Sequence, residues 1–301
     1  MLFAPEKLSL GIVLPIQPRT IGNGETTDID FALQLDLAAR ADALGFSALW
    51  VRDVPLNSPA YPDPIGHSDP WILLGALAAT TRRITLATGA IVLPLRHPFH
   101  IAKAALSLDA LSKGRVLLGL GAGDRPSEFK AFGRNVADRR ELFRDNWAAL
   151  SSALSGDIGG REDFRMRPRS GRDITRVAVG SSSQSLEWIA RNASAWMTYH
   201  RPLAVQKDRI GLWHGAVGRS TTAFRGLGQA MAFELVDTVS DGIEEITLGY
   251  RAGPDGLVKI LGELRALGVH HVALNLAMDG ARAASALAVI AKDVLPRLND
   301  D

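Results

Sequence analysis

The stretch "TGAIVLPLRHP", residues 88–98, begins with the aliphatic and β-branched residues of a buried strand and ends in a basic tip bracketed by two prolines. Gly89 and Ala90 interrupt the strand near its start, and Arg96 and His97 lie in its tip. Small residues weaken a buried strand, because they add little side-chain volume to the core. Strand formation does not explain why Gly89 and Ala90 occur here, and the explanation depends on the surrounding fold.

Apolar, strand-forming runs of this kind recur along the chain, with stretches of helical periodicity between most of them. In one such stretch, Leu257, Ile260, Leu261 and Leu264 share a face. Strands that alternate with helices pair in parallel. Eight strands predict a (β/α)8 TIM barrel, one domain over residues 1–301, with an open doubly wound sheet as the alternative. The eight runs are residues 10–14, 48–51, 84–93, 116–120, 177–179, 196–199, 230–236 and 269–276.

Glycine, proline and aspartate predict helix boundaries. Gly45 and Gly268 follow helical stretches where a left-handed C-cap is expected. Asp69 followed by Pro70 predicts an N-cap with proline in the first turn. The first helix is expected to bury one face, made of Phe31, Leu35, Ala38 and Ala39.

Two polar segments interrupt the alternation, at residues 57–68 and 155–172. Both are rich in turn-forming or charged residues, so we expect them to extend from the sheet without adding a domain. One of them is a candidate for a mobile lid, and both are expected to influence the choice of substrate.

Composition excludes several classes of protein. Lys and Arg total 34 against 32 for Asp and Glu, a net charge of +2 that gives no case for nucleic-acid binding. The absence of cysteine excludes disulfides and thiolate chemistry. The first ten residues include Glu6 and Lys7 and have no apolar core typical of a signal peptide, and no apolar run is long enough to span a bilayer. We expect a cytoplasmic protein.

Metal binding is not predicted. His270 and His271 are adjacent in a strand, where their side chains point to opposite faces. His97 and His100 lie three residues apart at a helix start, without a nearby carboxylate to complete a ligand set.

Two turns that follow strands were compared with anion-binding motifs. "GLGAGD", residues 119–124, fails as a dinucleotide fingerprint because Asp124 replaces the third glycine, so we interpret it as a tight turn. "VGSSSQSLEW", residues 179–188, places Gly180, Ser181, Ser182 and Ser185 between a strand and a helix, which suits a phosphate. The alternative is an ordinary serine N-cap.

Arg52 and Asp53 end the second strand, within "LWVRDVP". The carboxyl ends of barrel strands carry the reactive groups of barrel enzymes, so both residues are candidate catalytic groups. The alternative is a simple ion pair at the rim.

Several stretches in this order resemble the bacterial luciferase-like flavin-dependent monooxygenases: "DLAARADALGFSALWV", "DPWILLGALAATTRRITLATGAIVLPLRHPFHIAKAALSLDALSKGRVLLGLGAG", "EFKAFG" and "VGSSSQSLEWIA". The resemblance runs from about residue 8 to residue 199. It implies a TIM barrel that binds FMN, or in a sister branch a deazaflavin coenzyme. It also implies a non-prolyl cis peptide at Gly89-Ala90 beneath the flavin ring, and a phosphate site at Ser181, Ser182 and Ser185.

The chain departs from this family at two positions. The luciferase histidine after strand two corresponds to Asp53, and the phosphate-binding arginine after strand four corresponds to Ala122. We therefore expect no light emission, and we expect Arg125 or another basic residue to neutralise the phosphate.

The resemblance thus implies a two-component monooxygenase that takes reduced FMN from a separate reductase and oxygenates a small organic substrate with O2. Arg52 and Asp53 are the candidate reacting groups, and His97, Tyr199 and His200 are further rim residues near flavin or substrate. The alternatives are hydride transfer with the deazaflavin coenzyme and a non-catalytic flavin-binding protein. The family also implies a homodimer, through helices near residues 72–79 and 101–111.

Overall fold

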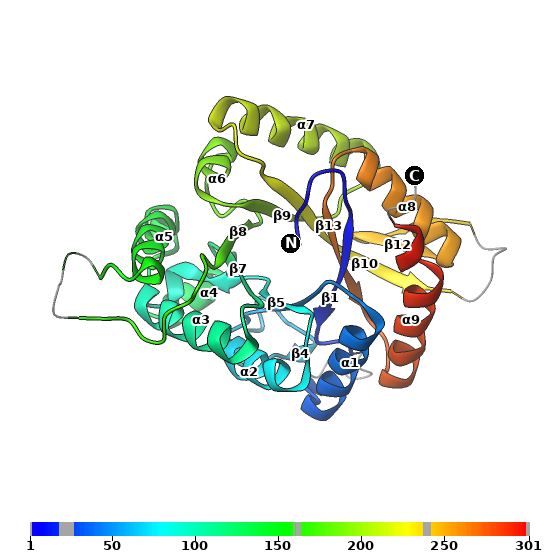
Figure 1. Ribbon diagram of the computed structural model, residues 1–301, viewed down its shortest axis with the longest axis horizontal. Helices are drawn as coiled ribbons and strands as arrows, with labels where there is room; N and C mark the ends of the chain where they lie inside the picture. The colour runs from blue at the N-terminus through cyan, green and yellow to red at the C-terminus, as the bar shows by residue number, and fades with distance from the viewer. Residues whose placement is uncertain (1, 18–26, 159, 161–163, 237–241, 299–301) are drawn as a thin grey trace.

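The computed structural model describes residues 2–17, 27–158, 160, 164–236 and 242–298. Eight parallel strands form a closed barrel, because the last of them pairs back to the first (Figure 1). This confirms the predicted TIM barrel and all eight predicted strands. In order around the barrel they are β1 (Ser9–Leu14), β3 (Ala48–Val51), β5 (Thr85–Thr88), β7 (Val116–Gly121), β8 (Thr175–Val179), β9 (Ala195–Tyr199), β10 (Gly226–Leu235) and β13 (His271–Leu276).

Helices surround the barrel, and the larger hydrophobic core fills the layer between strands and helices (Figure 1). The helices are α1 (Phe31–Leu44), α2 (Pro70–Thr80), α3 (Pro98–Ser112), α4 (Pro126–Ala131), α5 (Arg139–Ser155), α6 (Leu186–Asn192), α7 (Leu203–Ser220), α8 (Pro254–Ala266) and α9 (Gly280–Asp293), with single 3-10 turns η1 (Leu93–Leu95), η2 (Val136–Asp138) and η3 (Leu295–Arg297). Among the described residues, no helix combines the length and the apolar character needed to cross a membrane.

The predicted caps are confirmed. Gly45 and Gly268 have left-handed φ values of 92° and 93°, and the Asp69 side chain accepts a hydrogen bond from the backbone N–H of Trp71 at the start of α2. The apolar face predicted for α8 is buried throughout.

The face predicted for α1 is partly wrong. Phe31 is 41% exposed, and the polar Gln34 is fully buried instead. The reason is a pair of hydrogen bonds that the periodicity of apolar residues does not reveal. Ile16 N–H donates to the Gln34 side-chain oxygen at 2.8 Å, and the Gln34 amide donates to the Ile16 carbonyl at 3.0 Å.

The third strand is broken at Gly89 and Ala90. β5 ends at Thr88, and pairing to β7 resumes in β6 (Ile91–Val92) before the chain turns in η1. The peptide bond between Gly89 and Ala90 is cis, as the resemblance implied.

A second, smaller core fills the inside of the barrel, with Trp50 and Met197 as its largest members on the strands. Leu2 and Phe3 close its amino end. Gly226 and Gly228 make room for Phe3, because a Cβ at either position would lie within 3.1 Å of the Phe3 ring. The amino end of the barrel is therefore packed.

The end of the segment 155–172 lies at the amino end of the barrel, and residues 159 and 161–163 lie outside the described residues, so its roles as a candidate lid and in the choice of substrate stay predictions. Arg172 donates to Asp109 near the end of α3 at 2.8 Å and to the carbonyl of Val116 at the start of β7 at 2.7 Å. A segment that connects a helix to the next strand must reach the amino end of that strand. The segment 57–68 instead follows β3, and it carries β4 (Ile65–Gly66), which pairs with β2 (Thr27–Asp28).

Candidate active site

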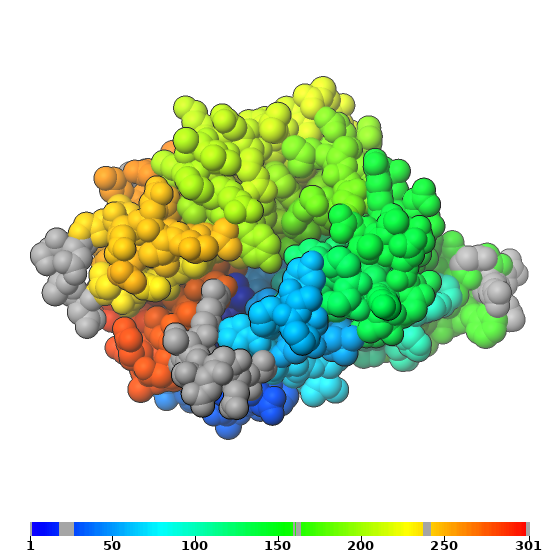
Figure 2. All heavy atoms as spheres, turned by 180° about the vertical axis from the view of Figure 1, so that it is seen from behind, coloured from blue at the N-terminus to red at the C-terminus, as the bar shows by residue number. Residues whose placement is uncertain are grey.

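Two adjoining cavities form one cleft at the carboxyl ends of the strands. We call the first, of about 340 Å³, the apolar cavity, and the second, of about 380 Å³, the arginine cavity. Figure 2 looks onto this end, which is hollowed between the segment after β3 and the segment after β9. The lining residues that both cavities share are Arg52, Gly89, Val179, Thr198 and Tyr199.

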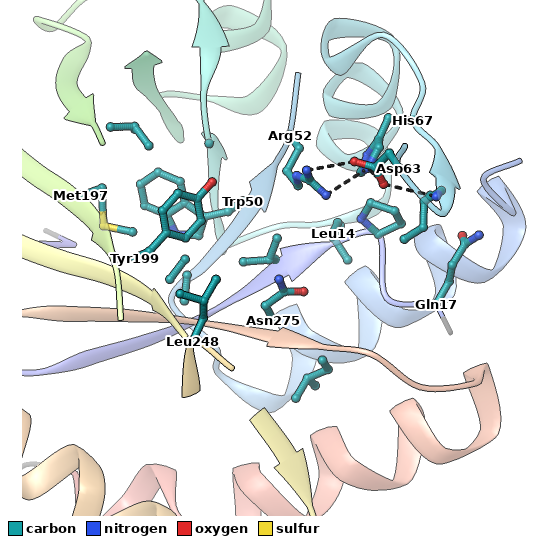
Figure 3. Close-up of a pocket in the computed structure, with 18 of the residues that line it drawn as sticks. Leu14, Gln17, Trp50, Arg52, Asp63, His67, Met197, Tyr199, Leu248 and Asn275 are labelled. Atoms are coloured by element: carbon teal, nitrogen blue, oxygen red, sulfur yellow. Dashed lines mark hydrogen bonds and ion pairs between the residues drawn. The ribbon is translucent and has the colours of Figure 1, made fainter. Parts of the chain in front are cut away.

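Trp50 and Gly89 meet at the bottom of the apolar cavity. A Cβ on Gly89 would lie 3.0 Å from the Trp50 ring, so glycine is required here for packing against the indole. Met197, Leu248 and Leu276 add apolar walls, and polar groups gather at one end (Figure 3). The small residue that seemed to weaken the strand thus accommodates a large buried ring.

Arg52, Asp63 and His67 form the polar end of the apolar cavity (Figure 3). Asp63 Oδ2 accepts from Arg52 Nη2 at 3.1 Å and from Arg125 Nη2 at 3.2 Å, and its Oδ1 lies 3.4 Å from His67 Nε2. Burial acts to raise the pKa of Asp63, but the His67 hydrogen bond and the Arg52 charge outweigh it and hold that pKa well below its usual range. One carboxylate therefore holds two arginines at the cleft.

Asp53 has a different setting from the one predicted for a reacting group. Its oxygens accept from Arg96 Nε at 2.9 Å and Nη2 at 2.8 Å, and from the backbone N–H of Val92 at 3.1 Å. Its side chain is 1% exposed. Because both oxygens are engaged, Asp53 anchors the basic tip of the third strand and presents no free carboxylate to the cleft.

The serine turn after β8 lines the arginine cavity with Gly180, Ser181, Ser182 and Ser183. Gly180, Ser182 and Ser183 have left-handed φ values of 67°, 47° and 54°. The Ser182 hydroxyl donates to strand carbonyls, those of Val179 at 3.0 Å and Leu120 at 3.3 Å. The Ser182 hydroxyl is therefore used within the protein, whereas Ser181 lines the cavity.

Ser185 does not line the cavity. Its hydroxyl caps α6 by accepting from Trp188 N–H at 3.2 Å, which is the serine N-cap that the sequence left as an alternative. The serine N-cap therefore applies to Ser185, and phosphate binding stays a prediction for Gly180, Ser181 and Ser182.

The arginine cavity is named for Arg52, Arg125, Arg139, Arg201 and Arg209, which all line it. Arg209 on α7 donates to the Thr198 hydroxyl, and its guanidinium lies 5.4 Å from the Trp196 ring centre. Burial and the charge of Arg201 lower the pKa of Arg209. Arginine donors converging from four segments suit a phosphate or another anion.

Glu128 lies in the same cavity, and burial raises the pKa of its carboxyl while the charge of Arg125 opposes that rise. Arg125 Nη1 lies 3.8 Å from Glu128 Oε1, so this arginine of the cavity has a second carboxyl neighbour besides Asp63.

A model of the luciferase-like monooxygenase family matches residues 8–238. The chain belongs to this family. The 4-hydroxyprotoasukamycin monooxygenase of Streptomyces nodosus subsp. asukaensis is 35% identical over 153 residues, which are 50% of this chain and 39% of that protein. The F420-dependent hydroxymycolic acid dehydrogenase of Mycobacterium tuberculosis is 28% identical over 200 residues, 62% of this chain and 54% of that protein. The matches to these relatives thus span about two fifths to half of their lengths.

Solved structures of luciferase-like proteins share the fold. Monooxygenase RslO1 from Streptomyces bottropensis superposes with a TM-score of 0.76 at 21% identity, covering 96% of this chain and 99% of that one. The oxygenating constituent of 3,6-diketocamphane monooxygenase from Pseudomonas putida, in complex with FMN, gives 0.74 at 17% identity, covering 96% and 98%. At these identities the likeness establishes the barrel architecture alone.

Among the rim residues predicted from the family, the structure brings Tyr199 to the cleft but not His97 or His200. Tyr199 lines both cavities and is 51% exposed. His97 accepts from Phe99 N–H at the start of α3 and lines a third cavity, of about 670 Å³, which shares Asp53 and Val54 with the arginine cavity and His67 with the apolar cavity.

His200 is buried and faces Gln229, whose amide lies 3.0 Å from its Nδ1. Burial lowers the pKa of His200 to about 4. It is therefore neutral at physiological pH and belongs to the packing behind the strands.

The predicted Arg125 lies in the cleft, whereas sequence reasoning missed Asp63, His67, Arg139, Arg201 and Arg209. Asp63 and His67 belong to a segment predicted only in general terms to influence the choice of substrate, and Arg139 is far along the chain from Arg201 and Arg209. The run of polar residues after strand two was the one local signal for the first two. Among the described residues, no group of three possible ligands could hold a metal ion.

Proposed function

We propose that this protein is a flavin-dependent monooxygenase that uses reduced FMN and O2 to oxygenate a small organic substrate. The observation that carries the proposal is the meeting of an apolar cavity and an arginine cavity at Gly89. This shape fits a cofactor with a flat ring at one end and a phosphate at the other. The monooxygenases among its relatives support the reaction class.

The residues of the arginine cavity would hold the phosphate. Arg125, Arg139, Arg201 and Arg209 supply charge, and Ser181 supplies a hydroxyl and a backbone N–H at the same cavity. Within the described residues, no protein acceptor takes the backbone N–H of Ser181 or Ser182. These donors would remain available to an anion.

The apolar cavity would hold the ring and the substrate. Gly89 and Ala90 would lie against the ring, with Trp50 below and Tyr199 at the rim. When bound, the flavin supplies the oxygen chemistry. The chain excludes water with its apolar walls, and Arg52 places a hydrogen-bond donor beside the reacting region, held there by Asp63 at 3.1 Å.

The second candidate is hydride transfer with the deazaflavin coenzyme. Two observations favour it: a relative named as an F420-dependent dehydrogenase is 28% identical over 200 residues, and the five arginines of the cavity suit a ligand with more anionic charge than one phosphate. A separate reductase would be needed only by the FMN reaction. A homodimer formed through α2 and α3 is compatible with both candidates.

Anaerobic titration of the protein with reduced FMN and with reduced F420 tests the choice. We expect saturable binding of reduced FMN, followed by O2-dependent product formation when a flavin reductase and a panel of small apolar substrates are added. Binding of reduced F420 alone would overturn the FMN proposal in favour of hydride transfer. FMN binding without product from any substrate would favour a non-catalytic flavin-binding protein.

A further inference from the structure

The buried His271 lies inside the barrel and forms a hydrogen-bonded chain to the bottom of the cleft. Trp50 Nε1 donates to His271 Nε2 at 2.9 Å, and His271 Nδ1 lies 2.7 Å from the Ser9 hydroxyl. The Ser9 hydroxyl in turn lies 2.8 Å from the Leu2 carbonyl. The chain thus runs from the packed amino end of the barrel to the cleft.

The donors and acceptors in this chain fix the form of the imidazole. An indole N–H only donates, so His271 Nε2 must be the unprotonated acceptor. The proton then lies on Nδ1, which donates a hydrogen bond to the Ser9 oxygen, and the Ser9 hydroxyl donates to the Leu2 carbonyl. Full burial, opposed by the contact with Ser9, lowers the pKa of His271 to about 3, so this neutral form persists across physiological pH.

The surroundings of His271 leave the ring no other position. Gly11 makes room for it, because a Cβ there would lie 2.9 Å from the imidazole. Phe3 packs edge-on against it, with ring centres 5.8 Å apart. On the other side of the indole, the Trp50 ring packs against Gly89 at the bottom of the apolar cavity.

We propose that His271 is a positioning residue for the cofactor: it fixes the Trp50 indole, which forms the floor of the apolar cavity beneath Gly89. The inference rests on the proposed function for the identity of the ligand, but its first step concerns the protein alone. An indole held at both its N–H and its ring edge sets the depth at which a flat ring can rest. Without the acceptor at residue 271, the indole N–H is left buried and unpaired, and the indole turns to find another partner.

The first test uses the protein without ligand. The Trp50 indole N–H resonance is assigned by its loss in Trp50→Phe. We expect it to move toward the position of a free indole in His271→Leu and to stay near its native position in His271→Gln, whose amide can accept from Trp50 and donate to Ser9. An unchanged resonance in His271→Leu would overturn the inference.

The second test measures binding of reduced FMN. We expect His271→Leu and Trp50→Phe each to weaken binding by about tenfold or more, as misplacement of a supporting ring does, and His271→Gln to restore most of the loss. The double variant is expected to bind no more weakly than the weaker single one. Val177→Ala is the matched control, because Val177 is fully buried in the same inner core but lines neither cavity.

The outcomes separate the two proposals. Wild-type protein that binds neither cofactor would overturn the proposed function, while the resonance test still decides whether His271 holds Trp50. Native affinity in His271→Leu, or an equal loss in Val177→Ala, would overturn the positioning role alone. If His271→Leu does not fold, Trp50→Phe decides the binding step, since it keeps His271 and removes the indole N–H.

Discussion

The two cavities of the cleft are built in opposite ways. The apolar cavity stands on the inside of the barrel, where Trp50, Gly89 and Met197 are fixed by close packing. The arginine cavity draws its charge from side chains on separate segments, several of them partly exposed. Close packing determines the shape of the apolar cavity, whereas positive charge determines the character of the arginine cavity. We therefore expect the first to tolerate almost no added atom, and the second to lose affinity gradually as single charges are removed.

The largest effect is expected when one methyl group is added to the closely packed apolar cavity, at Gly89. In Gly89→Ala the new Cβ would lie 3.0 Å from the Trp50 ring, which is buried and hydrogen-bonded to His271. Overpacking of this kind costs about 1–3 kcal/mol in the free energy of unfolding. We also expect the loss of most reduced-FMN binding.

Urea unfolding and anaerobic titration measure these two quantities. Gly75→Ala in α2 is the matched control, because its Cβ would meet nothing within 4 Å, and it is expected to be neutral or slightly stabilising. Native stability and binding in Gly89→Ala would show that the floor is not rigid.

Asp63→Asn tests the junction between the two cavities. The change leaves Arg52 and Arg125 without the carboxylate that they share, at 3.1 and 3.2 Å. We expect a loss of about 1–3 kcal/mol in the free energy of unfolding and weaker coupling of oxygen use to product formation. Asp173→Asn, at an exposed ion pair with Arg176, should stay within about 0.5 kcal/mol of wild type. Equal stability of the two variants would contradict a structural role for Asp63.

The pH dependence of stability tests the buried histidines. The folded pKa values of His271 and His200, about 3 and about 4, lie below the ordinary value of 6.5. The unfolded chain therefore binds more protons between pH 4 and 6.5, so the stabilisation is complete above pH 6.5 and is lost as the pH falls. Each histidine contributes a slope of up to about 1.4 kcal/mol per pH unit.

Urea unfolding between pH 5 and 7.5 measures this slope. His271→Gln is expected to have a shallower slope, because it removes one of the histidines whose folded pKa is lowered. The same slope in wild type and variant would show that His271 does not stay neutral in the folded protein.

The smallest effect is expected for a single arginine of the arginine cavity. In Arg139→Gln the remaining arginines still hold the phosphate, so reduced-FMN affinity should fall about three- to tenfold, and less in high salt. Arg134→Gln is the control, because Arg134 is exposed and lines neither cavity. An abolished affinity in Arg139→Gln would mean that one contact dominates and that the charge is not shared.

Sequence patterns predicted the barrel well because strand and helix periodicities are local. The same holds for the caps at Gly45 and Asp69, whereas the break at Gly89 and Ala90 followed from the family resemblance, since the local pattern predicted one strand over residues 84–93. The site was harder to predict, because its contacts join distant residues. Trp50 and His271 are separated by 221 positions, and no local pattern shows that one donates to the other.

Asp53 illustrates the limit in another way. Its position at the carboxyl end of β3 suited a reacting group, but the chain that follows Gly89 brings back Arg96 to bind it at 2.8 Å. Asp63 was read as part of a loop, yet it holds Arg52, Arg125 and His67 at the cleft. Position along the strand predicted which end of the barrel carries the cleft. Asp53 and Asp63 both line the cleft, and their partners decide what each carboxylate holds there.

The segment 57–68 has a consequence for protein engineering. Its Asp63 is docked on Arg52, directly after β3, and on Arg125 in the turn between β7 and α4. The segment is therefore not a cassette that can be exchanged between homologues by itself. A chimera that receives a foreign segment should keep its activity only when the incoming sequence carries an acid for these two arginines, or when the arginines are transferred with it.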